Sequence, residues 1–151
     1  MKKQLLIFIC LFSSFEVKSE QIFITCEMKH VKKIGSDGLD LMKEWDWLGE
    51  GTYTQEFFVD SKKKIFVYPN LIDLFNPEEL FRFEFSPHKI YKEKHTYQKF
   101  PTLDKSKIIQ VEIFDLNRIT GEITVEQKPG NQSEKFYTLI HGTCEKIKRK
   151  I

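Results

Sequence analysis

The sequence is poor in the residues that mark several large classes of protein. Its 151 residues include only seven glycines and five prolines, which excludes a collagen-like chain. A 30% share of charged residues beside 40% hydrophobic ones excludes a disordered polar tail. The one strongly apolar run, from Leu5 to Phe12, is too short to cross a bilayer as a helix, so a polytopic membrane protein is also excluded. The composition fits one domain.

The usual local motifs of catalysis and metal binding are missing as well. The four histidines are all more than five residues apart, at His30, His88, His95 and His141. No serine lies in a Gly-x-Ser-x-Gly motif, and no glycine-rich phosphate loop is present. We therefore expect no catalytic residues, no metal and no cofactor. Residues distant in sequence can still meet in a fold, so an enzyme remains the less favoured class.

The first 19 residues have the pattern of a secretory signal peptide. Two lysines come first, the apolar run follows, and modest or small residues precede a cleavage site after Ser19. We predict a signal peptide at 1–19 and a single β domain at 20–151, exported to the periplasm or secreted. An N-terminal anchor that stays attached is the alternative.

The mature chain is expected to be electrically neutral. Residues 1–19 contain three of the 24 basic residues and one of the 22 acidic ones, so 21 of each remain. Nucleic-acid binders usually have a clear basic excess, so we expect no nucleic-acid partner. We also expect no transmembrane segment in the mature chain.

Two cysteines remain beyond the predicted leader. Cys26 lies near the start of the mature chain and Cys144 near its end. In an exported protein such a pair predicts a disulfide, here one that closes a loop of 118 residues. The bond would tie the first strand to the last.

Apolar and polar residues alternate with a period of two, which predicts β-strands. The alternating runs are 22–28, 81–85, 109–113 and 123–125, and less regular strands are expected at 53–59, 65–68 and 136–144. No apolar stripe of helical period continues for three turns. We predict an all-β fold, an antiparallel meander that closes into a small barrel of about eight strands, with a β-sandwich as the alternative.

A hairpin turn is predicted between two of these strands. Asn117, Arg118 and Thr120 precede Gly121, which supplies the residue of positive φ that a type I turn with a bulge requires.

Two further connections can be interpreted. The run from Asn76 to Leu80 predicts one helical turn, capped by Asn76 with Pro77 at its first position. The polar run from Lys94 to Lys105 contains Pro101 and predicts a longer loop.

Both tryptophans, Trp45 and Trp47, lie in one acidic segment that is followed by glycines. Two residues apart in a strand, they would face the same way. They would then form the floor or rim of a ligand cavity, or a hot spot for a protein partner. The alternative is that they plug one end of the barrel. With Tyr53 and Phe57 on the next strand, they are the candidate binding residues.

The end of the chain resembles small secreted, disulfide-bearing β-barrel proteins of Gram-negative bacteria, most of which are uncharacterised. The resemblance rests on the segment from Asp115 to Glu122, the final Gly142-Thr143-Cys144, and Thr25-Cys26 in the first strand. It implies a fold and export rather than an activity. The early and late cysteines are also similar, more loosely, to those of periplasmic inhibitors of C-type lysozyme.

We therefore expect an exported, non-catalytic binding or interaction protein of the bacterial envelope. One alternative is a lipocalin-like carrier that holds a small hydrophobic ligand among its aromatic residues, which a solidly packed interior would exclude. A second alternative is a protein similar to the lysozyme inhibitors.

Overall fold

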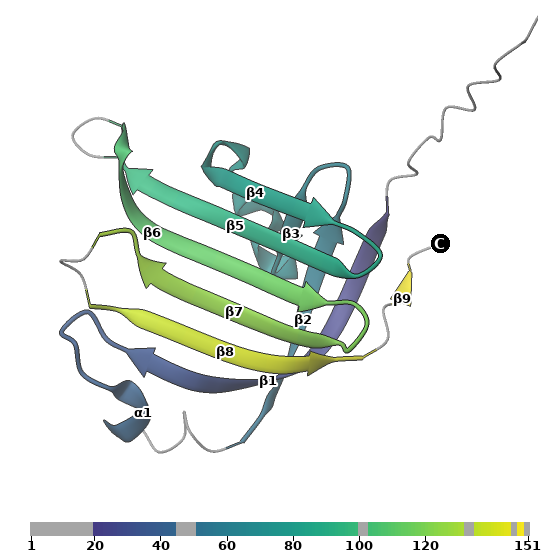
Figure 1. Cartoon of the computed structure of the whole chain (residues 1–151), viewed down its shortest axis with the longest axis horizontal. Coiled ribbons are helices and arrows are strands. Elements are labelled where there is room, and N and C mark those ends of the chain that lie inside the picture. Colours follow the sequence, from purple (N-terminus) through teal and green to yellow (C-terminus); the bar gives the residue numbers. More distant parts are fainter. Residues whose placement is uncertain (1–19, 45–50, 100–102, 132–134, 146–147, 150–151) are drawn as a thin grey trace, which may run out of the picture.

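The computed structural model describes residues 20–44, 51–99, 103–131, 135–145 and 148–149, and most of them lie in one antiparallel sheet (Figure 1). The predicted leader and the two tryptophans lie outside the described residues. The strands are β1 (Gln21–Ile34), β2 (Tyr53–Asp60), β3 (Ile65–Val67), β4 (Leu80–Phe85), β5 (Lys89–Gln98), β6 (Asp104–Asn117), β7 (Glu122–Pro129), β8 (Tyr137–Cys144) and β9 (Lys148–Arg149). The helical turns are α1 (Leu41–Glu44), η1 (Pro69–Leu74) and η2 (Pro77–Glu79).

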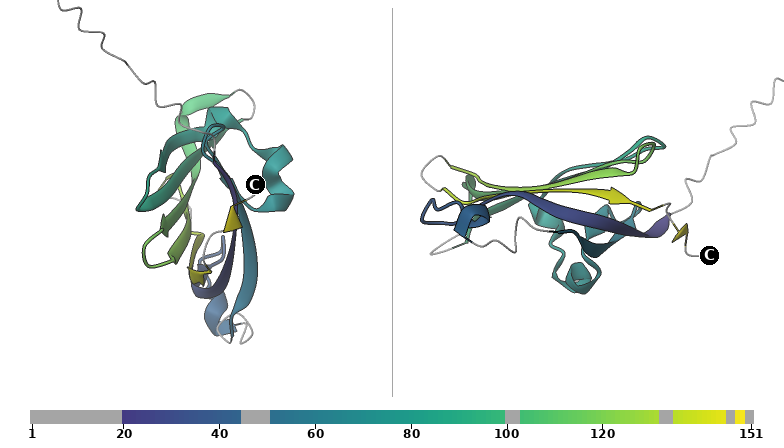
Figure 2. Two further views of the ribbon diagram at one scale, coloured as in Figure 1. Left: turned by 90° about the vertical axis from the view of Figure 1, so that its right-hand side faces the viewer. Right: turned by 90° about the horizontal axis from the view of Figure 1, so that it is seen from below.

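The strands follow the order β3-β2-β1-β8-β7-β6-β5-β4, and β9 pairs with β1. This confirms the all-β, antiparallel prediction, and the chain from β4 to β8 is a simple meander. The sheet curls into a half-barrel rather than closing (Figure 2). Its two end strands, β3 and β4, do not pair with each other in the described part of the chain. β3 has only three residues and is soon followed by Pro69, which starts η1, so the chain leaves the sheet there.

β1 joins the two parts of the sheet. Its first half, from Gln21 to Met28, pairs with β2, and its second half, from Cys26 to Ile34, pairs with β8. The register shifts between His30 and Lys32, as at a bulge, which bends and twists a strand. β1 therefore belongs both to the curved meander and to the β2–β3 hairpin that lies behind it in Figure 1.

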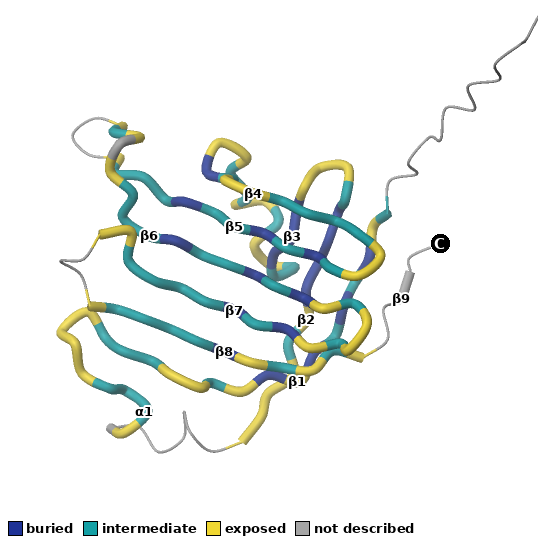
Figure 3. The backbone as a smooth tube through the Cα atoms, viewed as in Figure 1, coloured by how far each residue is buried: buried dark blue, intermediate teal, exposed yellow. Residues whose placement is uncertain are grey.

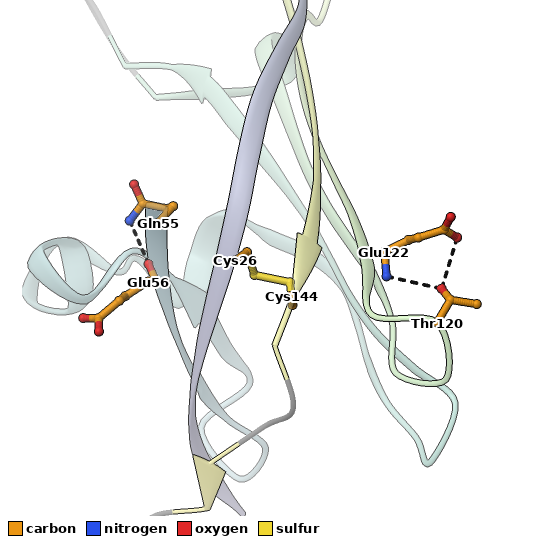
Figure 4. The surroundings of a disulfide bond; sticks show 6 residues. All are labelled: Cys26, Gln55, Glu56, Thr120, Glu122 and Cys144. Carbon is orange, nitrogen blue, oxygen red and sulfur yellow. Dashed lines mark hydrogen bonds between the residues drawn. A yellow bond between two sulfur atoms is a disulfide. The ribbon is translucent and has the colours of Figure 1, made fainter. Parts of the chain in front are cut away.

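The predicted disulfide is confirmed. Cys26 and Cys144 lie opposite each other in the paired strands β1 and β8 and form a disulfide (Figure 4). Cys26 is buried within the main core. The bond therefore crosslinks the first strand to β8 at the joint between the two parts of the sheet.

The main core fills the space between the β2–β3 hairpin and the meander, where the buried residues of Figure 3 gather. Phe57 and Phe66 lie 5.7 Å apart, ring centre to ring centre, and both contact Phe114 of β6 at 5.8 and 5.1 Å. Tyr68 packs on Phe57 and Phe114 at 5.2 and 5.7 Å. Tilted and edge-to-face pairs of this kind favour tight aromatic packing.

A smaller apolar cluster lies on the other face of the hairpin. Phe58, Ile65 and Val67 are buried there, and Phe23, Ile72 and Phe75 pack against them. Because Ile72 belongs to η1, this 3₁₀ helix covers the face of the hairpin that points away from the meander.

Both predicted turns are confirmed. Asn117 Oδ1 accepts hydrogen bonds from the backbone N–H groups of Ile119 (2.9 Å) and Thr120 (3.1 Å), and Gly121 has a φ of +78°. Asn76 likewise accepts a hydrogen bond from the Glu78 backbone N–H and caps η2, with Pro77 in the first turn.

The predicted loop from Lys94 to Lys105 is wrong over most of its length, because β5 continues to Gln98 and β6 starts at Asp104. The polar side chains of β5 find partners that compensate their burial. Lys94 Nζ lies 2.9 Å from a Glu79 carboxylate oxygen, and His95 Nε2 lies 2.7 Å from Glu93 Oε1. Polar composition therefore did not prevent strand pairing here.

We predict that Gly121→Ala destabilises the fold more than Gly51→Ala. Both glycines have positive φ, at +78° and +91°, so each alanine brings backbone strain of about 1–2 kcal/mol. A Cβ at Gly121 would also lie 2.8 Å from the Cys144 carbonyl oxygen, whereas a Cβ at Gly51 would meet no atom within 4 Å. Urea unfolding of both variants measures the difference, and equal midpoints would contradict this account of the hairpin.

Candidate functional site

The concave face of the half-barrel is the one on which the β2–β3 hairpin packs. The strand registers place the residues of this face in rows that run across the meander. Directly paired residues of neighbouring strands point to the same face. The first row is Met28, Gly142, Ile123, Leu116, Ile90 and Phe85. The second row is His30, Ile140, Val125, Phe114, Lys92 and Phe83. The third row is Lys33, Thr138, Gln127, Glu112, Lys94 and Leu80.

The chemistry of the concave face changes from the second row to the third. The first two rows are mostly apolar and supply much of the main core. From Lys33 to Lys94 the third row is entirely polar, its members are only half-buried, and none belongs to the core. We call Lys33, Thr138, Gln127, Glu112 and Lys94 the inner polar row. It begins where the β2–β3 hairpin stops filling the half-barrel.

Lys92 lies at this boundary and is 1% exposed. Its Nζ donates hydrogen bonds to the Phe66 carbonyl oxygen (3.0 Å) and to Glu112 Oε1 (2.9 Å), and lies 4.4 Å from the centre of the Phe114 ring. Gln127 Nε2 donates to the other oxygen of Glu112 at 3.1 Å. Both carboxylate oxygens are therefore held, which fixes the centre of the inner polar row.

Aromatic side chains border this polar centre. Tyr53 faces the same side as Met28, with which it pairs, and its ring stacks on His30 with 5.6 Å between ring centres. Tyr53 is 38% exposed, whereas Tyr68 is half-buried against the core. The concave face therefore combines accessible ring surface with hydrogen-bonding side chains.

The surroundings perturb several ionisable groups here. Burial, and then the charge of Lys33, lowers the pKa of His30. Burial raises the pKa of Tyr53, and burial followed by the nearby Tyr53 and Glu112 raises that of Tyr68 far above its usual range. Burial also lowers the pKa of Lys92 although Glu112 opposes this shift. His30 is therefore neutral near neutral pH.

The candidate binding residues that were predicted from the sequence lie in different parts of the structure. Tyr53 lies on the concave face and stacks on His30 of the second row, whereas Phe57 is 0% exposed and packs inside the core. Trp45 and Trp47 are not among the described residues, which begin again at Gly51. The structure brings Tyr53 together with His30, which was not among the candidate residues.

Lys92, Glu112 and Gln127 were not among the residues predicted from the sequence. The period of two suggested that Ile109, Val111 and Ile113 of β6 face inward, but the register places Glu112 and Phe114 on the concave face. The sequence did contain a usable signal. Glu112 lies two residues before Phe114 and therefore shares its face of the strand, and a polar residue on an otherwise apolar face marks the place where a core ends.

A hollow of about 550 Å³ lies on the opposite, convex face. Glu27 and Lys29 of β1, His141 and Thr143 of β8, and Glu122 of β7 contribute to its lining. These side chains are exposed. A second hollow of about 250 Å³ lies beside η2, where the carboxylate of Glu79 is held by two lysines. The concave face is the candidate we favour because Glu112, held by Lys92 and Gln127, lies there close to the accessible Tyr53 ring.

The described residues contain no group of three or more histidines, cysteines, aspartates or glutamates placed to hold a metal ion. They also include no helix that is long and apolar enough to cross a membrane.

Comparisons with protein-family models, with curated proteins and with solved structures find no match. The resemblance to small secreted barrels and to lysozyme inhibitors therefore stays a prediction.

We predict that acid weakens the fold through His30. Because the folded-state pKa of His30 lies below its ordinary value of 6.5, the unfolded chain binds more protons as the pH falls through that value, and stability is lost. The carboxyls of Glu79 and Glu93 have lowered pKa values and act only at lower pH. His30→Gln should therefore flatten the change in urea midpoint between about pH 7.5 and about pH 5.5. The same change in the variant and the wild type would contradict this role.

Proposed function

We propose that this protein is an exported, non-catalytic binding protein that takes a polar ligand on the inner polar row and Tyr53. The observation that carries the proposal is the change from apolar to polar residues along the concave face. A concave surface with a few fixed polar groups beside aromatic rings is typical of ligand-binding sites.

The arrangement suits a ligand rich in hydroxyl groups, such as an oligosaccharide. The amide of Gln127, the hydroxyl of Thr138 and the ammonium of Lys33 lie across neighbouring strands, about 5 Å apart in the pairing direction. Such side chains donate to and accept from successive hydroxyls, while a ring such as Tyr53 packs against the C–H faces of a sugar. Because Glu112 and Gln127 are already held by hydrogen bonds, these side chains lose less conformational entropy when a ligand binds.

The packing argues against a carrier of a hydrophobic ligand. The contacting rings of Phe57, Phe66, Tyr68 and Phe114 occupy the apolar part of the half-barrel. A carried apolar molecule would need that space, and the remaining concave surface is polar. The disulfide is compatible with an oxidising compartment, which supports export.

The test is titration calorimetry of the mature, oxidised protein with a panel of envelope-derived oligosaccharides and with palmitate. We expect an oligosaccharide to bind and palmitate not to bind. Tyr53→Ala should weaken binding about tenfold or more, since an accessible aromatic contact is worth about 1.4 kcal/mol or more.

The matched control is His141→Ala in the convex hollow, which should leave the affinity unchanged. Stoichiometric palmitate binding, no binding of any oligosaccharide, or a loss of affinity in His141→Ala with none in Tyr53→Ala would each overturn the proposal.

A further inference from the structure

β4 is a free edge of the sheet. In the part of the chain that the structure describes, it pairs with β5 on one side and with no strand on the other. The opposite end strand, β3, has three residues and is followed by η1, whereas β4 has six. An edge strand leaves a row of backbone donors and acceptors that another strand can pair with. β4 is therefore the longer of the two places where the open half-barrel can be extended.

The hydrogen bonds of the β4–β5 hairpin show which backbone groups face this edge. The Ser86 N–H donates to the Lys89 carbonyl oxygen at 2.9 Å, so Ser86 and Lys89 form a hydrogen-bonded pair. Hydrogen-bonded and non-hydrogen-bonded pairs alternate along antiparallel strands. Glu84 therefore bonds to Tyr91 of β5, and the backbone groups of Phe83 and Phe85 point to the free edge.

The charges on the two sides of Phe83 are opposite, so the strand is complementary in charge to an antiparallel copy of itself. When two β4 strands pair antiparallel with Phe83 opposite Phe83, Arg82 of each copy lies opposite Glu84 of the other. Both side chains are accessible, 62% and 38% exposed, and both belong to the convex face. Opposite charges placed directly across two strands stabilise the pair.

The neighbouring symmetric registers are unfavourable. Pairing centred on Arg82 would place the arginines of the two copies opposite each other. Pairing centred on Glu84 would do the same with the two glutamates. Like charges directly opposite each other destabilise a strand pair. Of these three registers, the charges on this edge therefore favour the one centred on Phe83.

An exposed aromatic ring lies beside the same edge. Phe81 occupies the register shift between Leu80 and Arg82 and is 63% exposed. It stacks on His95 with 4.2 Å between ring centres, which holds it at the edge of the convex face. A strand added to β4 would cover part of this ring.

We propose that two copies of this chain associate through β4, antiparallel and centred on Phe83, so that the two half-barrel sheets become one continuous sheet. The partner is a second copy because the register that pairs Arg82 with Glu84 is satisfied by β4 itself. The dimer does not depend on the proposed ligand, since the inner polar row from Lys33 to Lys94 lies on β1 and β5–β8 rather than on this edge.

The test exchanges charges on the mature, oxidised chain and measures mass by sedimentation equilibrium. Arg82→Glu and Glu84→Arg should each raise the dimer dissociation constant about tenfold or more. Each variant has two places in the dimer where residue 82 of one copy and residue 84 of the other carry the same charge. An equimolar mixture of the two variants should dimerise, since an acidic edge then meets a basic one. The double exchange, Arg82→Glu with Glu84→Arg, should dimerise like the wild type.

The mixture separates the proposed contact from a structural role within one chain. Arg82 and Glu84 lie 3.6 Å apart in the same chain, and both single variants break this ion pair, which mixing does not restore. Lys128→Glu is the matched control, because Lys128 and Glu126 have the same spacing, at 3.5 Å, on the interior strand β7. This control should dimerise normally.

The amide hydrogens of Phe83 and Phe85 give a readout in the wild type if the single variants fail to fold. Their exchange with deuterium should slow as the protein concentration rises. A wild type that stays monomeric throughout its soluble range overturns the proposal. It is also overturned by single variants that dimerise like the wild type, by a mixture that stays monomeric, or by amide exchange that is independent of concentration.

Discussion

The pairing of β1 with β8, crosslinked by Cys26 and Cys144, is the constraint on which the rest of the structure depends. β4 to β8 form a meander by local hairpins, and in the described part of the chain β2 and β3 join its backbone hydrogen-bond ladder through β1. β1 pairs with β8 over one half and with β2 over the other, and so places the β2–β3 hairpin across part of the concave face. The covered part becomes the core, and the uncovered part becomes the surface that we propose for the ligand.

Lys92 marks the boundary between these two parts. Burying an ammonium group is costly, and here Glu112, the Phe66 carbonyl oxygen and the Phe114 ring offset the loss of hydration. A buried ion pair of this kind is weak evidence for added stability. Its consequence is geometric, because it attaches β3 to β5 and β6 and leaves the carboxylate of Glu112 in one position beside Gln127.

Local features of the sequence predicted local structure well. The alternation in β1 and β7, the Gly121 hairpin and the capped turn at Asn76 each depend on residues that are close in the sequence. The disulfide was predicted from the two cysteines and the expected oxidising compartment. The inner polar row could not be predicted, because it depends on the register of five strands. The inward face of β6 was predicted wrongly because this strand is apolar on both faces, with Val111 on one and Phe114 on the other. The open half-barrel also was not predicted, because the composition of Ile65–Val67 does not show that this strand has only three residues.

The most direct test of the role of the joint is urea unfolding of the oxidised protein against the Cys26→Ser, Cys144→Ser double variant, without reductant. If the crosslink between β1 and β8 holds the two parts of the sheet together, the variant should lose up to about 4–5 kcal/mol, as expected for a closed loop of 118 residues. An unchanged unfolding midpoint would contradict the central place given to this joint.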